Sequence, residues 1–190
     1  MFRKLKRRTK KKTDYRQRLS LLKSGKPRLV VRKGLKNILV QIIKYEPEGD
    51  KILLSMLSKN LKKFGWLADY SNIPASYLTG LLLGCNALKK NIREVVADIG
   101  LQRSTKENKI YALVKGCIDA GLKIHIDEKI MPSDERIKGK YIEEYAKILK
   151  QTNPDKYKKQ FSSYLNNKIE PEEISKHFEE VKKRIINELK

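Results

Sequence analysis

The chain has 190 residues, with 44 Lys and Arg against 22 Asp and Glu, which gives a formal net charge of +22. Hydrophobic residues make up 39% of it, enough for a folded core, and this excludes a fully disordered chain. A charge of this size repels itself unless a polyanion neutralises it. A small-molecule enzyme is therefore a poor first interpretation, and nucleic acid is the expected partner.

The positive charge is concentrated at the N-terminal end. Residues 1–36 contain 16 Lys and Arg and a single acid, Asp14, for a net charge of +15, while the remaining 154 residues carry only +7. Eight of the first twelve residues are basic, and this segment cannot fold alone. We expect residues 1–27 to form a basic arm that becomes ordered on RNA; a solvated tail or a nuclear-import-like run is the alternative.

Three runs rich in β-branched and aliphatic residues follow the arm, at residues 28–33, 37–45 and 51–58. The connections between them contain Gly34, Pro47 and Gly49, which are typical of short hairpin loops. Tight links of this kind predict an antiparallel meander. One face must be covered because apolar residues dominate, and the polar members of the runs would populate the other face and the edge.

The apolar period then becomes helical. Asn72 is placed to cap a helix that starts near Pro74, and Gly80 and Gly84 would let this helix approach the sheet closely. Residues 94–99 are predicted to form a buried strand. Ser104 and Glu107 have capping-box spacing ahead of a second helix that ends near Gly121, and residues 123–126 are predicted to return parallel to strand 94–99.

The predicted fold is therefore α/β: a mixed sheet in which the three-strand meander is followed by a βαβ crossover, with packed helices. We expect residues 28–129 to form this body. Residues 130–190 carry three apolar stripes at helical spacing, and residues 171–190 contain five acids and five bases. This pattern indicates an amphipathic helical extension that docks on a protein or on the chain's own core.

Candidate metal ligands and nucleophiles are few. Cys85 and Cys117 lie far apart among apolar neighbours, and His125 and His177 are the two histidines of the chain. Buried structural thiols are the better interpretation, and we expect no metal and no cofactor. The long uncharged run from Tyr70 to Leu88 contains too many polar residues for a lipid-facing helix, so we expect no membrane segment.

Two alternatives would use the same basic arm. Asp98, Asp119 and Asp127 lie near predicted element ends, where a nuclease of mixed α/β fold would hold metal-binding carboxylates. Acids at such positions are more often turn or cap residues. A DNA-architectural protein is the other alternative.

Three segments carry a family likeness: GWLADYSNIPASYLTGLLLGCNAL (65–88), EVVADIGL (94–101) and IYALVKGCIDAGLKI (110–124). They resemble the family numbered eighteen among the universal large-subunit ribosomal proteins, which binds 5S rRNA. The stretch IMPSDERIKGKYIEEYA (130–146) is similar to an extension of the archaeal and eukaryotic branch. The likeness covers roughly residues 14–148 in the expected order, which is far more specific than a short motif.

The resemblance implies a non-catalytic protein of the ribosome, located in the cytoplasm. It would attach 5S rRNA to the large rRNA in the central protuberance, beside neighbouring proteins that include universal ribosomal protein five. Family positions that contact RNA carry over to Arg16, Arg18, Lys26, Arg28, Arg32, Lys33, Asn37 and Gln41. The turn KGLKN departs from the family, which commonly has a Ser-Asn or Thr-Asn step where this chain has Leu35.

The complete candidate rRNA-binding set joins these positions to the basic arm. Lys and Arg bind phosphates by releasing counterions, whereas Asn37 and Gln41 can donate and accept hydrogen bonds at base edges or 2′-hydroxyls. Tyr15 could stack on a base or tether the arm, and Trp66 is expected in the core. The set comprises Arg3, Lys4, Lys6, Arg7, Arg8, Lys10, Lys11, Lys12, Tyr15, Arg16, Arg18, Lys23, Lys26, Arg28, Arg32, Lys33, Lys36, Asn37 and Gln41.

Overall fold

A four-stranded mixed sheet forms the body of the computed structural model, which describes residues 6–189. The strands are β1 (Arg28–Lys33), β2 (Ile38–Lys44), β3 (Lys51–Leu57) and β4 (Val96–Asp98), in the order β3-β2-β1-β4. The first three pair antiparallel, as the meander predicted, and β4 pairs parallel with β1. Each predicted strand of the meander is confirmed to within one residue.

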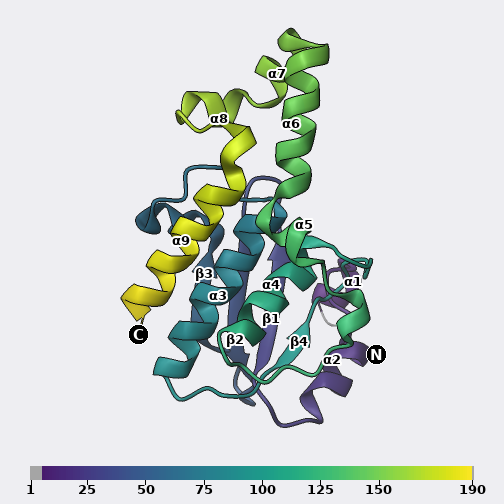
Figure 1. Cartoon of the computed structure of the whole chain (residues 1–190). Coiled ribbons are helices and arrows are strands. Elements are labelled where there is room, and N and C mark those ends of the chain that lie inside the picture. Colours follow the sequence, from purple (N-terminus) through teal and green to yellow (C-terminus); the bar gives the residue numbers. More distant parts are fainter. Residues whose placement is uncertain (1–5, 190) are drawn as a thin grey trace.

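Two helices cover one face of the sheet (Figure 1). Helix α3 (Ile73–Lys89) begins at Asn72, whose side chain accepts a hydrogen bond from the Ala75 N–H at 2.8 Å, as predicted. Helix α4 (Lys109–Asp119) is capped by Asn108 rather than by the predicted box at Ser104 and Glu107. Apolar residues of β1, β2, α3 and α4 form one cluster beneath this layer.

The glycines of α3 face the neighbouring helix and not, as expected, the sheet. A Cβ atom at Gly80 would lie 1.9 Å from the Leu113 carbonyl oxygen, and one at Gly116 would lie 2.2 Å from the carbonyl oxygen of Tyr77. Both distances are far below van der Waals contact. The two helix backbones therefore touch, and only glycine fits where they cross.

The predicted strand at residues 123–126 is wrong in the structure. Glu94 and Lys123 make a single parallel bridge, in which the Val95 N–H donates to the Lys123 carbonyl oxygen at 3.2 Å. Ile124 and Ile126 then pack against the apolar cluster without further pairing. Among the described residues, β4 is therefore an edge strand of the sheet, and its partner in the sheet is β1.

The C-terminal third is helical, as predicted, and it docks on the chain's own core. Tyr77 of α3 and Phe178 have ring centroids 5.6 Å apart, and Trp66 is fully buried in the same cluster. Tyr145 and Leu165 belong to the predicted stripes but remain 41% and 38% exposed. The extension comprises η2 (Glu128–Ile130), α5 (Asp134–Lys138), α6 (Lys140–Thr152), α7 (Pro154–Gln160), α8 (Ser162–Asn166), η3 (Pro171–Glu173) and α9 (Ile174–Leu189).

The extension has two parts with different surroundings. Helix α9 runs beside α3 and beside the 3-10 helix η1 (Ser58–Phe64), whereas α6, α7 and α8 project beyond the end of the sheet (Figure 1). Across residues 6–189, no helix combines the length and the apolar character needed to span a bilayer. The uncharged run from Tyr70 to Leu88 lies largely in α3.

Candidate nucleic-acid interface

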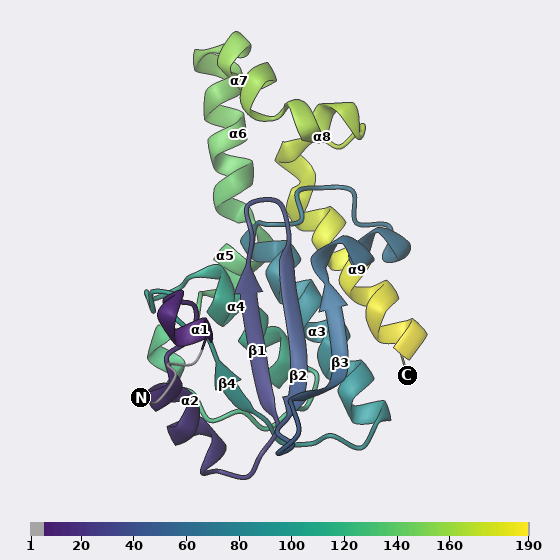
Figure 2. The same cartoon turned by 180° about the vertical axis from the view of Figure 1, so that it is seen from behind.

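The second face of the sheet is not covered by the helical layer (Figure 2). Side chains alternate along a strand, so Arg28, Val30 and Arg32 of β1 share this face with Leu39, Gln41 and Ile43 of β2. The N-terminal segment lies beside it, in the helices α1 (Lys6–Thr9) and α2 (Tyr15–Leu22). The uncovered sheet face and the basic arm therefore form one continuous surface.

Helix α2 is capped at its N-terminus, but none of its residues is buried against the α/β body. The Asp14 carboxylate accepts hydrogen bonds from the backbone N–H groups of Arg16 and Gln17 at 2.9 and 3.2 Å, which caps the helix. Every residue of α2 is exposed or half-buried. Its position consequently depends on polar contacts rather than on a packed apolar face.

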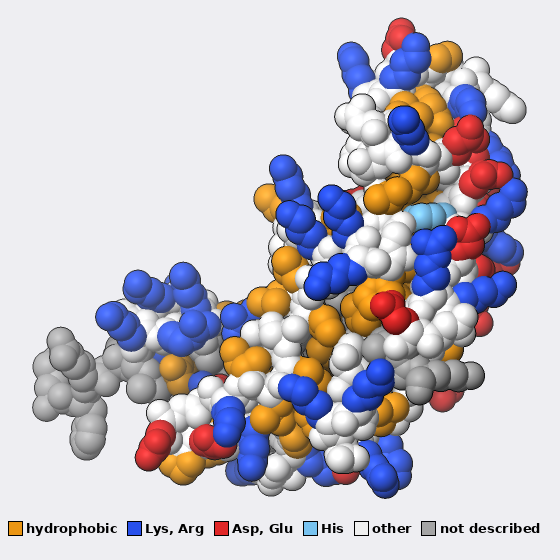
Figure 3. Space-filling model, turned by 90° about the vertical axis from the view of Figure 1, so that its left-hand side faces the viewer, with side chains coloured by type: hydrophobic (Ala, Val, Ile, Leu, Met, Phe, Trp, Pro, Cys, Tyr) orange, Lys and Arg blue, Asp and Glu red, His pale blue; other side chains and the backbone are white. Residues whose placement is uncertain are grey.

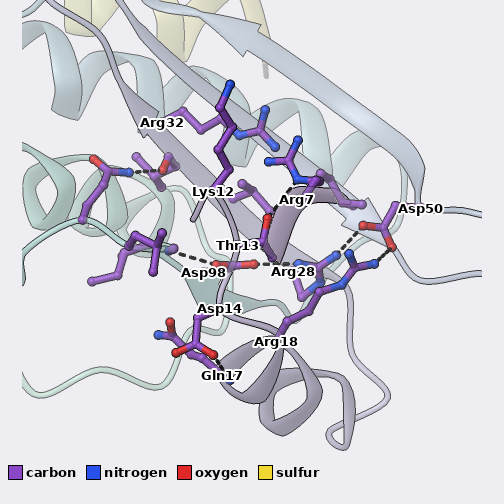
Figure 4. Close-up of a pocket in the computed structure, with 17 residues that line it drawn as sticks. Arg7, Lys12, Thr13, Asp14, Gln17, Arg18, Arg28, Arg32, Asp50 and Asp98 are labelled. Atoms are coloured by element: carbon purple, nitrogen blue, oxygen red, sulfur yellow. Dashed lines mark hydrogen bonds and ion pairs between the residues drawn. The ribbon is translucent and has the colours of Figure 1, made fainter. Parts of the chain in front are cut away.

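An ion-pair network ties the arm to the sheet (Figure 4). Asp50, just before β3, accepts from Arg18 of α2 at 2.9 Å and from Arg28 of β1 at 2.7 Å. Arg28 also pairs with Asp98 at the end of β4, at 2.6 Å. Arg28 is only 5% exposed, and charge-assisted pairs of this kind are strong when their geometry is good. The network thus links α2, β1, β4 and the start of β3.

Five of the predicted cations converge on one cavity next to this network. Arg7, Lys12, Arg18, Arg28 and Arg32 all line it, together with the acids Asp14, Asp50 and Asp98 (Figure 4). Arg18 and Arg28 are held by the acids. Within the described residues, Arg7, Lys12 and Arg32 form no ion pair. Their charge is therefore available to an outside anion.

The other predicted cations are spread along the molecule. The arm forms a lobe crowded with basic side chains, on the side of the molecule away from α9 (Figure 3). Lys33 and Lys36 are exposed at the β1–β2 turn, at the opposite end of the sheet from Lys23 and Lys26 (Figure 2). Lys26 pairs with Glu94 at 2.5 Å. Arg3 and Lys4 lie outside the described residues, whereas Lys6, Arg8, Lys10, Lys11 and Arg16 are exposed.

The remaining candidates are partly engaged inside the protein. Gln41 is 9% exposed and donates to the Ser55 hydroxyl at 3.3 Å, so it is held within the sheet face together with the buried Arg28. Asn37 is half-buried, and its carbonyl oxygen closes the hairpin by accepting from Gly34 at 2.8 Å. Tyr15 is half-buried, with the Arg18 guanidinium 6.0 Å from its ring centroid.

Sequence reasoning missed two residues that shape the surface. Asp50 was an unremarked member of the loop EPEGD, yet it fixes both Arg18 and Arg28. Gln102 donates through its side-chain amide to the Val31 carbonyl oxygen at 2.5 Å and lines the cavity. No local pattern marks either residue, because their partners lie far away in the sequence.

Asp98, Asp119 and Asp127, the three acids proposed as metal ligands of a nuclease, each interact with a different partner. Asp98 anchors Arg28, Asp119 accepts from the Tyr77 hydroxyl at 2.7 Å, and Asp127 caps η2 through the Lys129 N–H. No group of three or more His, Cys, Asp or Glu within residues 6–189 is arranged to hold a metal ion. The acids therefore have the turn, cap and pairing roles that acids at element ends commonly have.

An α/β body whose sheet has one face free of the helical layer, beside a cationic arm with unpaired Arg and Lys side chains, is an arrangement typical of proteins that bind polyanions such as nucleic acid. A family model described as ribosomal large subunit proteins 60S L5 and 50S L18 matches residues 2–97. The large ribosomal subunit protein uL18 of Methanococcus maripaludis is 49% identical over 181 residues, which cover 95% of this chain and 93% of that protein. The uL18 protein of Caldivirga maquilingensis is 50% identical over 184 residues, covering 96% and 89%.

The chain belongs to the uL18 family, in its archaeal branch. It is a structural protein of the large ribosomal subunit and not an enzyme, which excludes the nucleic-acid enzyme considered above. Ribosomal RNA and ribosomal proteins are accordingly its class of partner.

Proposed function

We propose that this protein binds 5S rRNA and helps to attach it to the large rRNA in the central protuberance. The observation that carries the proposal is the cavity beside the open sheet face, where Arg7, Lys12 and Arg32 converge without acidic partners in the described chain. Arg18 and Arg28 hold the arm in place through Asp50. The ion pairs of Arg18 and Arg28 support a positioning role for these two cations, and the unpaired Arg7, Lys12 and Arg32 support a role in phosphate binding.

The residue set for this contact follows from exposure. We assign phosphate binding to the exposed cations of the arm and of the sheet face, and we retain Tyr15 and Asn37 as candidates for stacking and hydrogen bonding. Arg28 and Gln41 support the surface from inside because both are buried. The division into an arm (1–27), an α/β body (28–129) and a helical extension (130–190) remains a prediction.

Charge removal in the arm tests the proposal. Replacing the exposed Lys10, Lys11 and Lys12 by alanine removes three positive charges without touching a buried residue. A matched control replaces Lys156, Lys158 and Lys159 of α7, which are exposed at the far end of the molecule. Affinity for 5S rRNA is measured by fluorescence anisotropy at several salt concentrations.

We expect the arm variant to lose affinity and the α7 variant to resemble the wild type. The slope of log K against log salt is negative, and each lost phosphate contact reduces its magnitude by about 0.7–0.9. Equal affinity of the two variants would refute the arm as the binding element. Equal affinity of the wild type for 5S rRNA and for double-stranded DNA would refute 5S rRNA as the specific partner.

We propose that universal ribosomal protein five binds the same 5S rRNA beside this protein. The family resemblance supports this, and the test is a ternary complex. Adding that protein to preformed 5S rRNA complex should give a further shift on a native gel. Displacement of one protein by the other would contradict the proposal.

A further inference from the structure

The cavity beside the arm has the size of a small-ligand site. Its volume is about 600 Å³, which lies within the usual range for pockets that enclose small organic molecules. Leu101, in the loop after β4, is 58% exposed and provides apolar surface, whereas Val30 and Ile43, from adjacent strands, form a floor that is 8% and 6% exposed. Arg7, Lys12 and Arg32 provide cations (Figure 4). Apolar surface next to three cations suits a ligand with a flat ring system and a phosphate.

The phosphate-binding side of the cavity is already partly organised. The Arg7 guanidinium donates through Nε to the Thr13 hydroxyl at 2.9 Å, which orients it and leaves its terminal N–H groups for an anion. Arg32 and Lys12 are exposed. The three cations come from α1, from the segment after it and from β1, so the cavity exists only when the arm lies against the sheet.

Two buried polar atoms in the cavity lining lack hydrogen-bond partners among the described residues. They are Nε of Arg28, a donor, and Oε1 of Gln102, an acceptor. Buried polar atoms are nearly always satisfied in folded proteins, so an unsatisfied pair beside one cavity calls for an explanation. A bound nucleobase edge presents both donors and acceptors. Neighbouring atoms cover both positions, so a base would reach them only after a shift of the arm or of the loop at residues 99–102.

We propose that this cavity binds a single nucleotide. Its phosphate pairs with Arg7, Lys12 and Arg32, and its base packs against Leu101, above the floor formed by Val30 and Ile43. We identify this nucleotide as an unpaired rRNA residue that is turned out of its stack, and this identification rests on the proposed function. Proteins recognise single RNA bases in this unstacked form. The site would therefore add base recognition to a surface that otherwise binds phosphates.

A substitution that fills the cavity without changing its charge tests the site. Val30→Phe adds a bulky ring at the sheet face inside the cavity. Leu39→Phe is the matched control, because Leu39 lies on the same sheet face, opposite Arg32, and is not part of the cavity lining. The probes are the four ribonucleoside monophosphates and, separately, inorganic phosphate. Amide NMR signals of residues 30, 43, 101 and 102 report binding.

We expect at least one nucleotide to shift these signals in the wild type and in Leu39→Phe, and not in Val30→Phe. Inorganic phosphate should leave them largely unchanged. The nucleotide site is overturned if phosphate alone produces the same shifts, if no nucleotide produces any, or if Val30→Phe responds like the wild type. Should Val30→Phe fail to fold by circular dichroism, the exposed Arg32→Gln replaces it, with weakened nucleotide binding as the expected result.

The source of the nucleotide is tested with 5S rRNA. Val30→Phe should lower the affinity about tenfold, the usual effect of losing one stacked base, while the salt slope stays unchanged. An unchanged affinity together with nucleotide binding would overturn the RNA source in favour of a free nucleotide. If the wild type binds no 5S rRNA, the proposed function fails, yet the nucleotide titration still decides whether the cavity is a site.

Discussion

His177 of α9 stacks on Trp66, with ring centroids 5.0 Å apart and ring planes inclined by 20°. The Nε2 atom of His177 also accepts a hydrogen bond from the Leu67 N–H at 3.4 Å. An accepting imidazole nitrogen carries no proton, so this contact requires the neutral form of His177. This contact joins the last helix of the extension to the loop that precedes α3. The extension is thereby held by a titratable residue.

The contact predicts an acid-sensitive extension. Burial lowers the pKa of His177 below its usual 6.5; nearby Glu180 acts in the opposite direction and Arg184 adds to the lowering. The unfolded chain then binds the proton more readily, so this stabilisation is complete above about pH 6.5 and is lost as the pH falls toward the lowered pKa. Urea unfolding followed by the fluorescence of Trp66 should show a lower midpoint at pH 5 than at pH 7.

Two histidine variants separate this effect from general acid denaturation. His177→Phe keeps a stacked ring and should reduce the pH dependence, whereas the exposed His125→Gln should leave it as in the wild type. An identical pH dependence in all three proteins would show that the His177 contact does not control the extension.

The contact between α3 and α4 predicts that Gly80 does not tolerate a methyl group. Gly80→Ala normally favours a helix, but here its Cβ would lie 1.9 Å from the Leu113 carbonyl oxygen. The helices must separate, and we expect the free energy of unfolding to fall by about 2–3 kcal/mol. Urea denaturation measures this, with the exposed Lys89→Ala on the same helix as a control that should change it by less than about 0.5 kcal/mol. A stabilised Gly80→Ala protein would contradict the close crossing.

The Arg28 network predicts that Asp98→Asn destabilises the body. Arg28 is almost completely buried and would keep only Asp50 as its anionic partner. We expect a loss of about 2–3 kcal/mol in the free energy of unfolding. The exposed pair Lys26–Glu94 provides the comparison: Lys26→Ala should cost less than about 1 kcal/mol. Equal effects of the two substitutions would mean that burial does not strengthen the network.

The cysteines should be poorly reactive in the folded protein. Burial raises the pKa of the Cys117 thiol, whose Sγ lies 3.3 Å from the Gly80 carbonyl oxygen, and also raises that of the half-buried Cys85. Since the thiolate is the nucleophile, a disulfide reagent should label Cys117 only slowly at pH 7, and both cysteines rapidly in urea. Rapid labelling of native Cys117 would indicate that the α3–α4 contact opens frequently.

The sequence by itself determined the three-strand meander, the start of α3 and the charge distribution. Apolar runs of strand length separated by Gly and Pro defined the meander, Asn72 marked the start of α3, and the arm was visible as an excess of Lys and Arg. These features are local: they depend on side-chain alternation, helix caps and composition within a few residues. The family resemblance of residues 65–88, 94–101 and 110–124 could be recognised because each is a continuous stretch of sequence.

Only the tertiary structure decided which of these residues face inward. Arg28 belonged to the basic surface by sequence, but Asp50 and Asp98, at separations of 22 and 70 residues, draw it into the body. Gly80 faces α4 rather than the sheet, and Lys123 makes one bridge instead of a strand. The cavity likewise joins residues of the arm, the sheet and the loop after β4. Such contacts depend on how distant segments are placed in space, and no local pattern encodes them.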